Sequence, residues 1–185
     1  MKKLVIIIAL LLVSLYFVKA QRMLPRQKAI EASGGLITKS VDKDYWFNLT
    51  FTVNAKGGDY WLWRGEYSHQ LTDYRSLTIT VESYTGEIGY SLNLMSNTRR
   101  NIALNAGILA IAGYETINKG DSILFDGAKI ISRDSFIYGG GLDLSIETYL
   151  SDHFVFVLHG RSKLIWGTDL KLFRPSAGLG LRYNF

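Results

Sequence analysis

The chain contains no cysteine and only two prolines among its 185 residues. Without cysteine there can be no disulfide, no thiolate metal ligand and no lipid-modified N-terminal cysteine. The few prolines provide no Pro-rich linker, and the Lys/Arg clusters that mark nucleic-acid-binding surfaces are also missing. After residue 20, charged, Gly or Asn residues interrupt every apolar stretch, which excludes a transmembrane helix. The chain is instead rich in glycine (18 residues) and aromatics (13%), which favours a β-sheet protein with tight turns.

The first 20 residues are organised like a secretory signal peptide. Two lysines precede an apolar run from Leu4 to Val13, and Val18-Lys19-Ala20 provides a cleavage motif. An uncleaved membrane anchor is the alternative, but the apolar segment is short for a span of about 20 residues. We therefore expect a cleaved signal peptide over residues 1–20 and a single domain over residues 21–185. Cleavage removes three lysines from a formal charge of +5 and so leaves +2.

The C-terminal end of the chain alternates in polarity, as a half-buried strand does. One face of this segment is apolar up to the last residue and is formed by Ala177, Leu179, Leu181, Tyr183 and Phe185. A terminal aromatic residue with Tyr two positions earlier resembles the assembly signal of bacterial outer-membrane β-barrels. We assign that signal to Leu179, Leu181, Tyr183 and Phe185, with the barrel-assembly machinery as its partner. The alternative is an edge strand of a soluble sheet, although a chain terminus seldom carries such an apolar face.

Alternation and turn signals predict eight strands along the chain. They cover residues 29–37, 44–53, 59–70, 77–94, 101–115, 135–150, 154–166 and 175–185. The connections at one rim are short and comprise residues 54–58, 95–100 and 151–153. Those at the other rim are longer on the whole and comprise residues 38–43, 71–76, 116–134 and 167–174. We therefore expect an all-β fold, an eight-stranded antiparallel up-and-down β-barrel of the outer-membrane type.

The two faces of the predicted strands differ in chemistry. In the second strand Tyr45, Phe47 and Leu49 share an apolar face, and such uncharged faces with aromatic ends suit contact with lipid. A soluble barrel with an apolar interior would alternate in the same way. The signal peptide, the terminal aromatic residue and the asymmetry of the connections favour a barrel in the outer membrane, surrounded by lipid.

The predicted strand at residues 77–94 departs from simple alternation. Its first apolar residues, from Leu77 to Val81, are out of phase with Tyr84 and Ile88. Either a β-bulge near Glu82–Ser83 shifts the register, or the first part of the strand projects beyond the membrane.

The opposite faces carry the charges that we expect inside the barrel. Eight strands enclose a space that side chains can fill, and an unpaired buried charge is very costly. Asp143 and Glu147 lie on the strand beside Arg161 and Lys163. We expect a closed ion-pair network formed by Glu31, Arg64, Glu66, Glu87, Asp143, Glu147, His159, Arg161, Lys163 and Arg182. A small polar pore or proton path is the functional alternative.

Neither catalysis nor a metal or other cofactor is expected. Ser68 and His69 are neighbours on a strand and therefore point to opposite faces, so no nucleophile and base are visible as a pair. The three histidines lack metal-ligand spacing, and the acids near residues 121–134 match no calcium-binding loop. The glycines at 139–141 lack the Lys-Ser/Thr of a phosphate-binding loop and favour a bend in the barrel wall.

Several segments resemble one family, the TraO proteins of conjugative transposons of Gram-negative gut bacteria. They are Gln21–Lys28, Gly113–Gly120, Phe125–Lys129, Glu147–Asp152, Gly160–Lys163, Trp166–Asp169 and Phe173–Gly178. The resemblance covers almost the whole chain after the signal peptide. It implies an envelope component of the mating apparatus, with other conjugation proteins as partners and no catalytic residues to carry over.

Two classes of function remain open from the sequence. The first is a structural or interaction component of the DNA-transfer apparatus, without a direct nucleic-acid site. In this case the apolar residues Ile123, Leu124 and Phe125 of the long connection could dock a partner or fold over the barrel. The second class is a stand-alone outer-membrane barrel for adhesion, envelope integrity or lipid modification.

Overall fold

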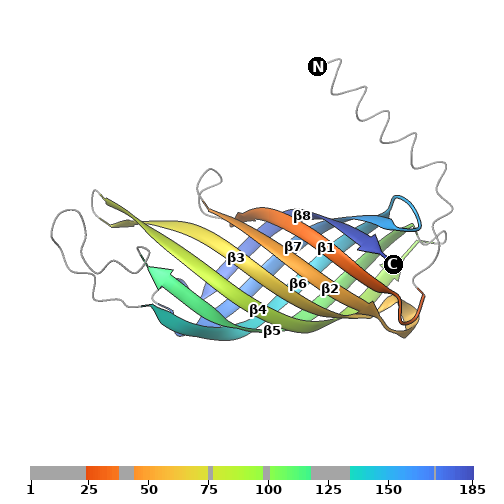
Figure 1. Ribbon diagram of the computed structural model, residues 1–185, viewed down its shortest axis with the longest axis horizontal. Helices are drawn as coiled ribbons and strands as arrows, with labels where there is room; N and C mark the ends of the chain where they lie inside the picture. Colours follow the sequence, from red (N-terminus) through yellow and green to blue (C-terminus); the bar gives the residue numbers. More distant parts are fainter. Residues whose placement is uncertain (1–23, 38–43, 75–76, 98–100, 118–133, 169) are drawn as a thin grey trace, which may run out of the picture.

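A computed structural model describes residues 24–37, 44–74, 77–97, 101–117, 134–168 and 170–185. In this part of the chain, eight antiparallel strands form a closed barrel in which each strand pairs with the next and the last pairs with the first (Figure 1). The strands are β1 (Lys28–Ile37), β2 (Tyr45–Asn54), β3 (Tyr60–Tyr74), β4 (Leu77–Ser96), β5 (Ile102–Ile117), β6 (Ser135–Tyr149), β7 (Phe154–Trp166) and β8 (Phe173–Asn184). A short 3-10 turn, η1 (Lys56–Gly58), connects β2 to β3. The predicted up-and-down antiparallel barrel is confirmed.

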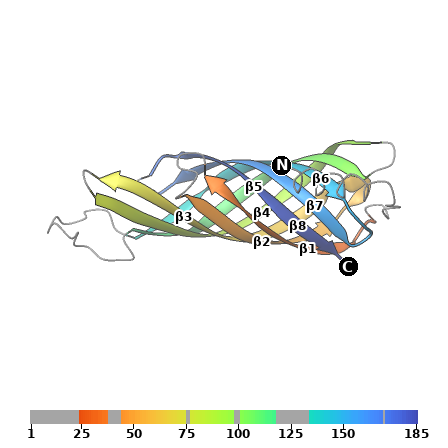
Figure 2. The ribbon, with the colours of Figure 1, turned by 90° about the horizontal axis from the view of Figure 1, so that it is seen from above.

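The strands cross the barrel obliquely in both views, and β1 lies beside β8 (Figures 1 and 2). The rim where β1 begins and β8 ends also carries the tight turns η1 and 150–153, and we call it the terminus rim. The opposite rim, where β1 ends and β8 begins, is called the loop rim. None of the described residues forms a helix long and apolar enough to cross a membrane.

Side chains alternate between the outside and the inside of the wall, as the period of two in a strand requires. In β7, Phe154 and Phe156 are exposed, whereas Val155 and Val157 are completely buried. The outward side chains are mostly Leu, Ile, Ala, Gly and aromatic residues. Among the side chains described on the strands, Lys28 at the terminus rim and Glu82 towards the loop rim are the only outward-facing Lys, Arg, Asp or Glu residues.

The course of β4 decides between the two expectations for this strand. β3 and β4 pair without interruption from Tyr60 and Ser91 to Tyr74 and Leu77, so the first alternative, a bulge near Glu82–Ser83, is wrong. The register shift lies instead between Asn93 and Met95, opposite β5.

The far ends of β3 and β4 continue past their neighbours. β2 pairs with β3 only as far as His69, and β5 pairs with β4 only as far as Val81. These ends form a two-stranded ribbon that projects beyond the barrel wall (Figure 1). The change of phase in the sequence therefore marks a strand that extends past the wall, as the second alternative requires.

The glycines at 139–141 belong to β6 and pair on both sides without a register shift. A Cβ atom at Gly139 would lie 2.1 Å from the backbone oxygen of Leu164. This glycine is therefore required by the close approach of β6 and β7.

Candidate functional site

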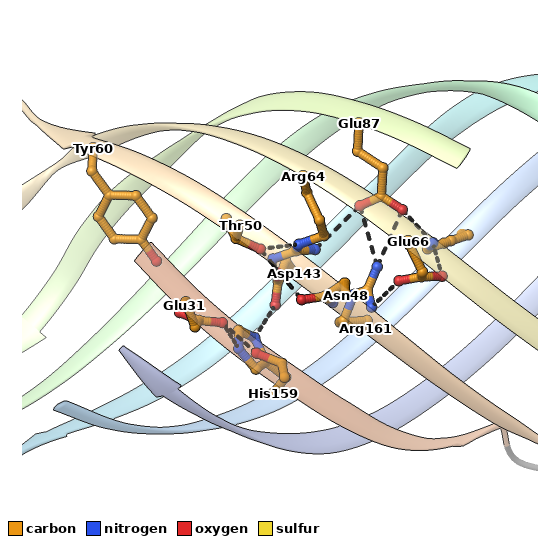
Figure 3. A network of polar contacts seen from close by, with 12 residues as sticks. Glu31, Asn48, Thr50, Tyr60, Arg64, Glu66, Glu87, Asp143, His159 and Arg161 are labelled. Carbon is orange, nitrogen blue, oxygen red and sulfur yellow. Dashed lines mark hydrogen bonds and ion pairs between the residues drawn. The ribbon is translucent and has the colours of Figure 1, made fainter. Parts of the chain in front are cut away.

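The charged interior of the barrel is the first candidate site. All ten residues expected in the network point inward and lie within one continuous set of ion pairs. Figure 3 shows its central part, from Glu31 and His159 to Glu66 and Arg161. In the middle of the barrel, Arg64 donates from Nη1 to Glu87 at 3.2 Å and from Nη2 to Asp143 at 2.7 Å. Its Nε donates to the hydroxyl of Thr50 at 2.9 Å. The guanidinium group thus connects β2, β3, β4 and β6.

Two further cations complete the half of the network nearer the loop rim. Arg161 contacts Glu66 at 2.6 Å and Glu87 at 3.2 Å. Lys163 contacts the same two carboxylates, with 2.6 Å between its Nζ and Glu66. The guanidinium of Arg161 also lies 4.6 Å from the centre of the Trp46 ring, which gives it a cation–π contact in addition to its ion pairs.

Some of these ion pairs join opposite residues of neighbouring strands, as Arg64 with Glu87 and Arg182 with Glu31. Others run across the lumen. Asp143 lies directly opposite Arg161 in the pairing of β6 with β7. Arg161 nevertheless reaches to β3 and β4, while Asp143 binds Arg64 and His159. The interior charges therefore tie opposite walls of the barrel together.

His159 joins the two halves of the network. Its Nε2 lies 2.8 Å from an oxygen of Glu31, and its Nδ1 lies 3.1 Å from an oxygen of Asp143. An ionised carboxylate only accepts hydrogen bonds, so the ring donates from both nitrogens and carries a positive charge. With His159 charged, the network has five cations for its five carboxylates.

Towards the terminus rim the network ends at two tyrosines. Arg182 contacts Glu31 and Glu147, each at 2.9 Å. Glu147 also accepts hydrogen bonds from Tyr60 at 2.9 Å and from Tyr149 at 3.1 Å. The two tyrosines were not singled out from the sequence, although both lie in the inward phase of their strands.

Apolar side chains pack around these two tyrosines. Tyr149 packs with Ala103, Val155 and Val157 in one buried cluster. Tyr60 packs with Leu62, Leu109 and Ile111 in another. The first cluster lies at the terminus rim, and the second extends from Tyr60 towards the middle of β5.

A smaller polar cluster occupies the loop-rim side of the interior. Glu115 contacts Arg174 at 3.0 Å and accepts hydrogen bonds from Ser83 and Thr168. Arg174, which was expected in a connection, is the second residue of β8 and is buried. A cavity of about 20 Å³ between Arg174 and Lys163 has room for about one water molecule. A larger solute does not fit there.

The three histidines lie in separate surroundings. His69 stacks on the ring of Tyr45, with 4.9 Å between the ring centres. His153 approaches the backbone oxygen of Asn184 at 3.0 Å, and His159 is in the charge network. Among the described residues, no group of three or more His, Asp or Glu side chains is arranged to hold a metal ion.

The outer surface carries aromatic residues near both rims. Towards the loop rim, tyrosine and phenylalanine rings contact one another from β2 to β4, and a second set joins β6 to β7. The loop-rim residues are Tyr45, Phe47, Tyr67, Tyr84, Phe136, Tyr138 and Trp166. The residues at the terminus rim are Trp61, Tyr90, Phe154, Tyr183 and Phe185. Mostly aliphatic side chains cover the wall between the two belts, together with the exposed rings of Phe51, Trp63 and Phe156.

The four residues assigned to the C-terminal assembly signal lie on this outer surface. Their exposed fractions range from 44% to 56% for Leu179, Leu181, Tyr183 and Phe185. The ring of Tyr183 packs against Phe154, with 5.3 Å between centres. The residues proposed for loop docking, Ile123, Leu124 and Phe125, lie outside the described residues, as does the expected signal peptide.

Comparison with known proteins adds a family and a fold. The family model "Conjugative transposon protein TraO" matches residues 24–185. None of the curated proteins matches the chain. Two solved structures show the same fold at low sequence identity, so this similarity concerns the fold alone.

The first of these structures is the N-terminal β-barrel domain of Pseudomonas aeruginosa OprF, with a TM-score of 0.51 and 12% identity over 87% of this chain and 98% of that chain. The second is Ail, the attachment invasion locus protein of Yersinia pestis, solved in complex with the heparin analogue sucrose octasulfate. Its TM-score is 0.52 at 14% identity over 88% of this chain and 100% of that chain. The expected fold class, an eight-stranded barrel of the outer-membrane type, is thereby confirmed.

Proposed function

The chain belongs to the conjugative transposon protein TraO family, and from this premise we propose that it is an outer-membrane β-barrel component of a conjugative DNA-transfer apparatus. Its role is structural: it holds partners and does not catalyse a reaction. The family match carries the link to conjugation.

Membrane placement is supported by the outer surface of the barrel. The aliphatic wall between two aromatic belts is the surface that a barrel presents to lipid. In water the same side chains would expose large hydrophobic patches, as shown by Leu49 at 64% and Ile108 at 68% exposure. Export to this membrane requires the signal peptide proposed for residues 1–20.

A structural role is supported by the interior. In the part of the chain that the structure describes, ion pairs cross the lumen and apolar clusters pack around Tyr60 and Tyr149, an arrangement that does not suit the passage of a DNA strand. The barrel therefore acts as a rigid, membrane-embedded support and not as a channel. Its connections at the two rims are the parts that other conjugation proteins can reach, and the connection at residues 118–133 is the proposed docking segment.

The experiment that tests this proposal combines fractionation with a transfer assay. Donor cells carrying a transposon without this gene are complemented with the full chain or with a chain lacking residues 118–133. We expect both proteins in the outer-membrane fraction, with gel migration that changes on heating, as it does for a folded barrel. Transfer should be lost without the gene, restored by the full chain and impaired by the shortened chain.

Three outcomes would contradict separate parts of the proposal. Normal transfer without the gene would indicate a stand-alone barrel for adhesion, envelope integrity or lipid modification. A soluble periplasmic protein without a heat-dependent shift would contradict the membrane placement. Normal transfer by the shortened chain would remove only the docking role of residues 118–133.

A further inference from the structure

Lys28 stands out on the surface that faces lipid in the proposed function. It is the first residue of β1 and is exposed. Among the described side chains of the strands, it is the only outward-facing Lys or Arg. Lys28 lies opposite Val53 of β2, and the same row of paired residues continues through Trp61 of β3 to Tyr90 of β4.

The same row continues on the other side of Lys28 into the C-terminal residue. The backbone N–H of Phe185 donates to the backbone oxygen of Lys28 at 2.9 Å. The rings of Trp61 and Tyr90 meet edge to face at 4.9 Å. Aromatic residues of barrels lie at the level of the lipid headgroups. Lys28 is therefore a cation within the aromatic belt, and its flexible side chain can extend to the phosphates.

Arg26 lies just beyond this belt in a turn with an unusual backbone. Its φ of 67° is the only left-handed value at a non-glycine residue in the described part of the chain. The turn is clamped to the end of β2, because Arg26 N donates to Asn54 O at 2.8 Å and Asn54 N donates to Gln27 O at 2.9 Å. An exposed arginine is thus held in a strained position where glycine or asparagine would be relaxed.

Lys56 provides a third cation in the adjacent turn η1, two residues after Asn54. None of Arg26, Lys28 and Lys56 forms an ion pair with another described residue. Asp59, which directly follows this turn, accepts hydrogen bonds from Tyr90 and from the backbone of Asn93 and is therefore already engaged.

We propose that Arg26, Lys28 and Lys56, the terminus cation cluster, bind the headgroup phosphates of anionic phospholipids. This site rests on the membrane placement in the proposed function. Arginine and lysine are the residues that bind phosphate, through a bidentate fork and a point charge respectively. A lipid is the occupant that fits because Lys28 lies within the aromatic belt, on the face turned to the membrane. An acidic segment of a periplasmic protein is the alternative outcome of the test.

The test measures which lipid the full-length processed protein retains. The wild type is reconstituted into vesicles of phosphatidylethanolamine and phosphatidylglycerol, and bound lipids are identified by native mass spectrometry after release in detergent. The triple variant R26N/K28Q/K56Q removes the charges, while asparagine tolerates the left-handed backbone at position 26. The control K171Q removes one exposed charge at the loop rim.

We expect the wild type and K171Q to retain phosphatidylglycerol in preference to phosphatidylethanolamine. Each cation at the membrane surface should contribute about fivefold to that preference, so the single variant K28Q should lose part of it and the triple variant nearly all. Heat-dependent gel migration checks that each variant is a folded barrel, and K28Q provides the measurement if the triple variant does not fold.

A folded triple variant with the wild-type lipid preference would overturn the site, as would a wild type without any preference. If that variant also lost transfer in donor cells, the cluster would belong to an acidic protein partner. A wild type that fails to insert into vesicles would contradict the membrane placement itself. The two failures are therefore distinguishable.

Discussion

Each charge in the barrel interior is held by more than one partner. Arg64 contacts Glu87, Asp143 and Thr50, and Glu87 also contacts Arg161 and Lys163. Desolvation makes a buried ion pair a weak source of net stability, but removal of one partner leaves a buried charge uncompensated. The loss of a single cation should therefore cost more than the pair itself contributes.

Arg64→Met tests this argument at the residue scale. We expect the free energy of unfolding to fall by about 3–5 kcal/mol, because Asp143 then keeps only His159 as a charged partner. The measurement is urea-induced unfolding of the reconstituted barrel, followed by gel migration. Arg64→Met combined with Asp143→Asn should recover part of the loss, since the two changes act on one contact. Additive losses in the double variant would show that this pair is not coupled.

Period-two alternation was sufficient to place these charges inside the barrel but not to pair them. Asp143 and Arg161 lie opposite each other on adjacent strands, yet they do not pair with each other. Arg161 reaches across the lumen to Glu66 and Glu87, and Asp143 binds Arg64 across the lumen and His159 on the adjacent strand. Which walls approach each other depends on the radius and stagger of the closed barrel, which alternation does not contain. Arg174 was missed for another reason, because β8 begins two residues earlier than predicted and turns this side chain inward.

At the scale of the element, β8 has two tasks. It closes the barrel by pairing with β1 over Ala29–Ile37, and its outward apolar residues form the proposed assembly signal. Phe185 is 56% exposed, so its ring contributes less to the folded barrel than a buried ring would. An effect of its removal on assembly should therefore be separable from an effect on stability.

Phe185→Ala should reduce the amount of assembled barrel in cells several-fold and change the stability of the assembled protein by less than about 1 kcal/mol. Phe136→Ala is the matched control, because Phe136 is a 64% exposed phenylalanine at the loop rim. Assembly is measured as the heat-shifted fraction in the outer membrane, and stability by urea unfolding. Equal assembly of the two variants would remove the signal role of Phe185.

The element scale also shows where a sequence pattern could be interpreted in two ways. The phase change before Tyr84 was compatible with a bulge and with a projecting strand, because both move apolar residues to the other face. Pairing with β3 through Tyr74 and the end of β5 pairing at Val81 decide for projection. That decision depends on the lengths of the neighbouring strands, which a single strand's sequence does not reveal.

At the scale of the whole molecule, the barrel combines an apolar outside with a filled interior. The charge network spans the lumen, and the apolar clusters around Tyr149 and Leu109 are buried beside it. The pore or proton path considered from the sequence would need a continuous polar passage. In the described residues the charge network instead ends at Tyr60 and Tyr149, which donate to Glu147.

The purified protein should therefore show no steady ion conductance in planar lipid bilayers. The double variant Tyr60→Ala/Tyr149→Ala removes the two rings at which the charge network meets the apolar clusters. If these rings block the lumen, the variant should give small conductance events. His153→Ala, at the same rim but outside the network, is the control and should remain silent. Steady conductance by the wild type would mean that the interior opens in the membrane. A structural barrel keeps its interior ion pairs closed, whereas a channel must open a path between them. Steady conductance would therefore contradict the structural role and indicate transport.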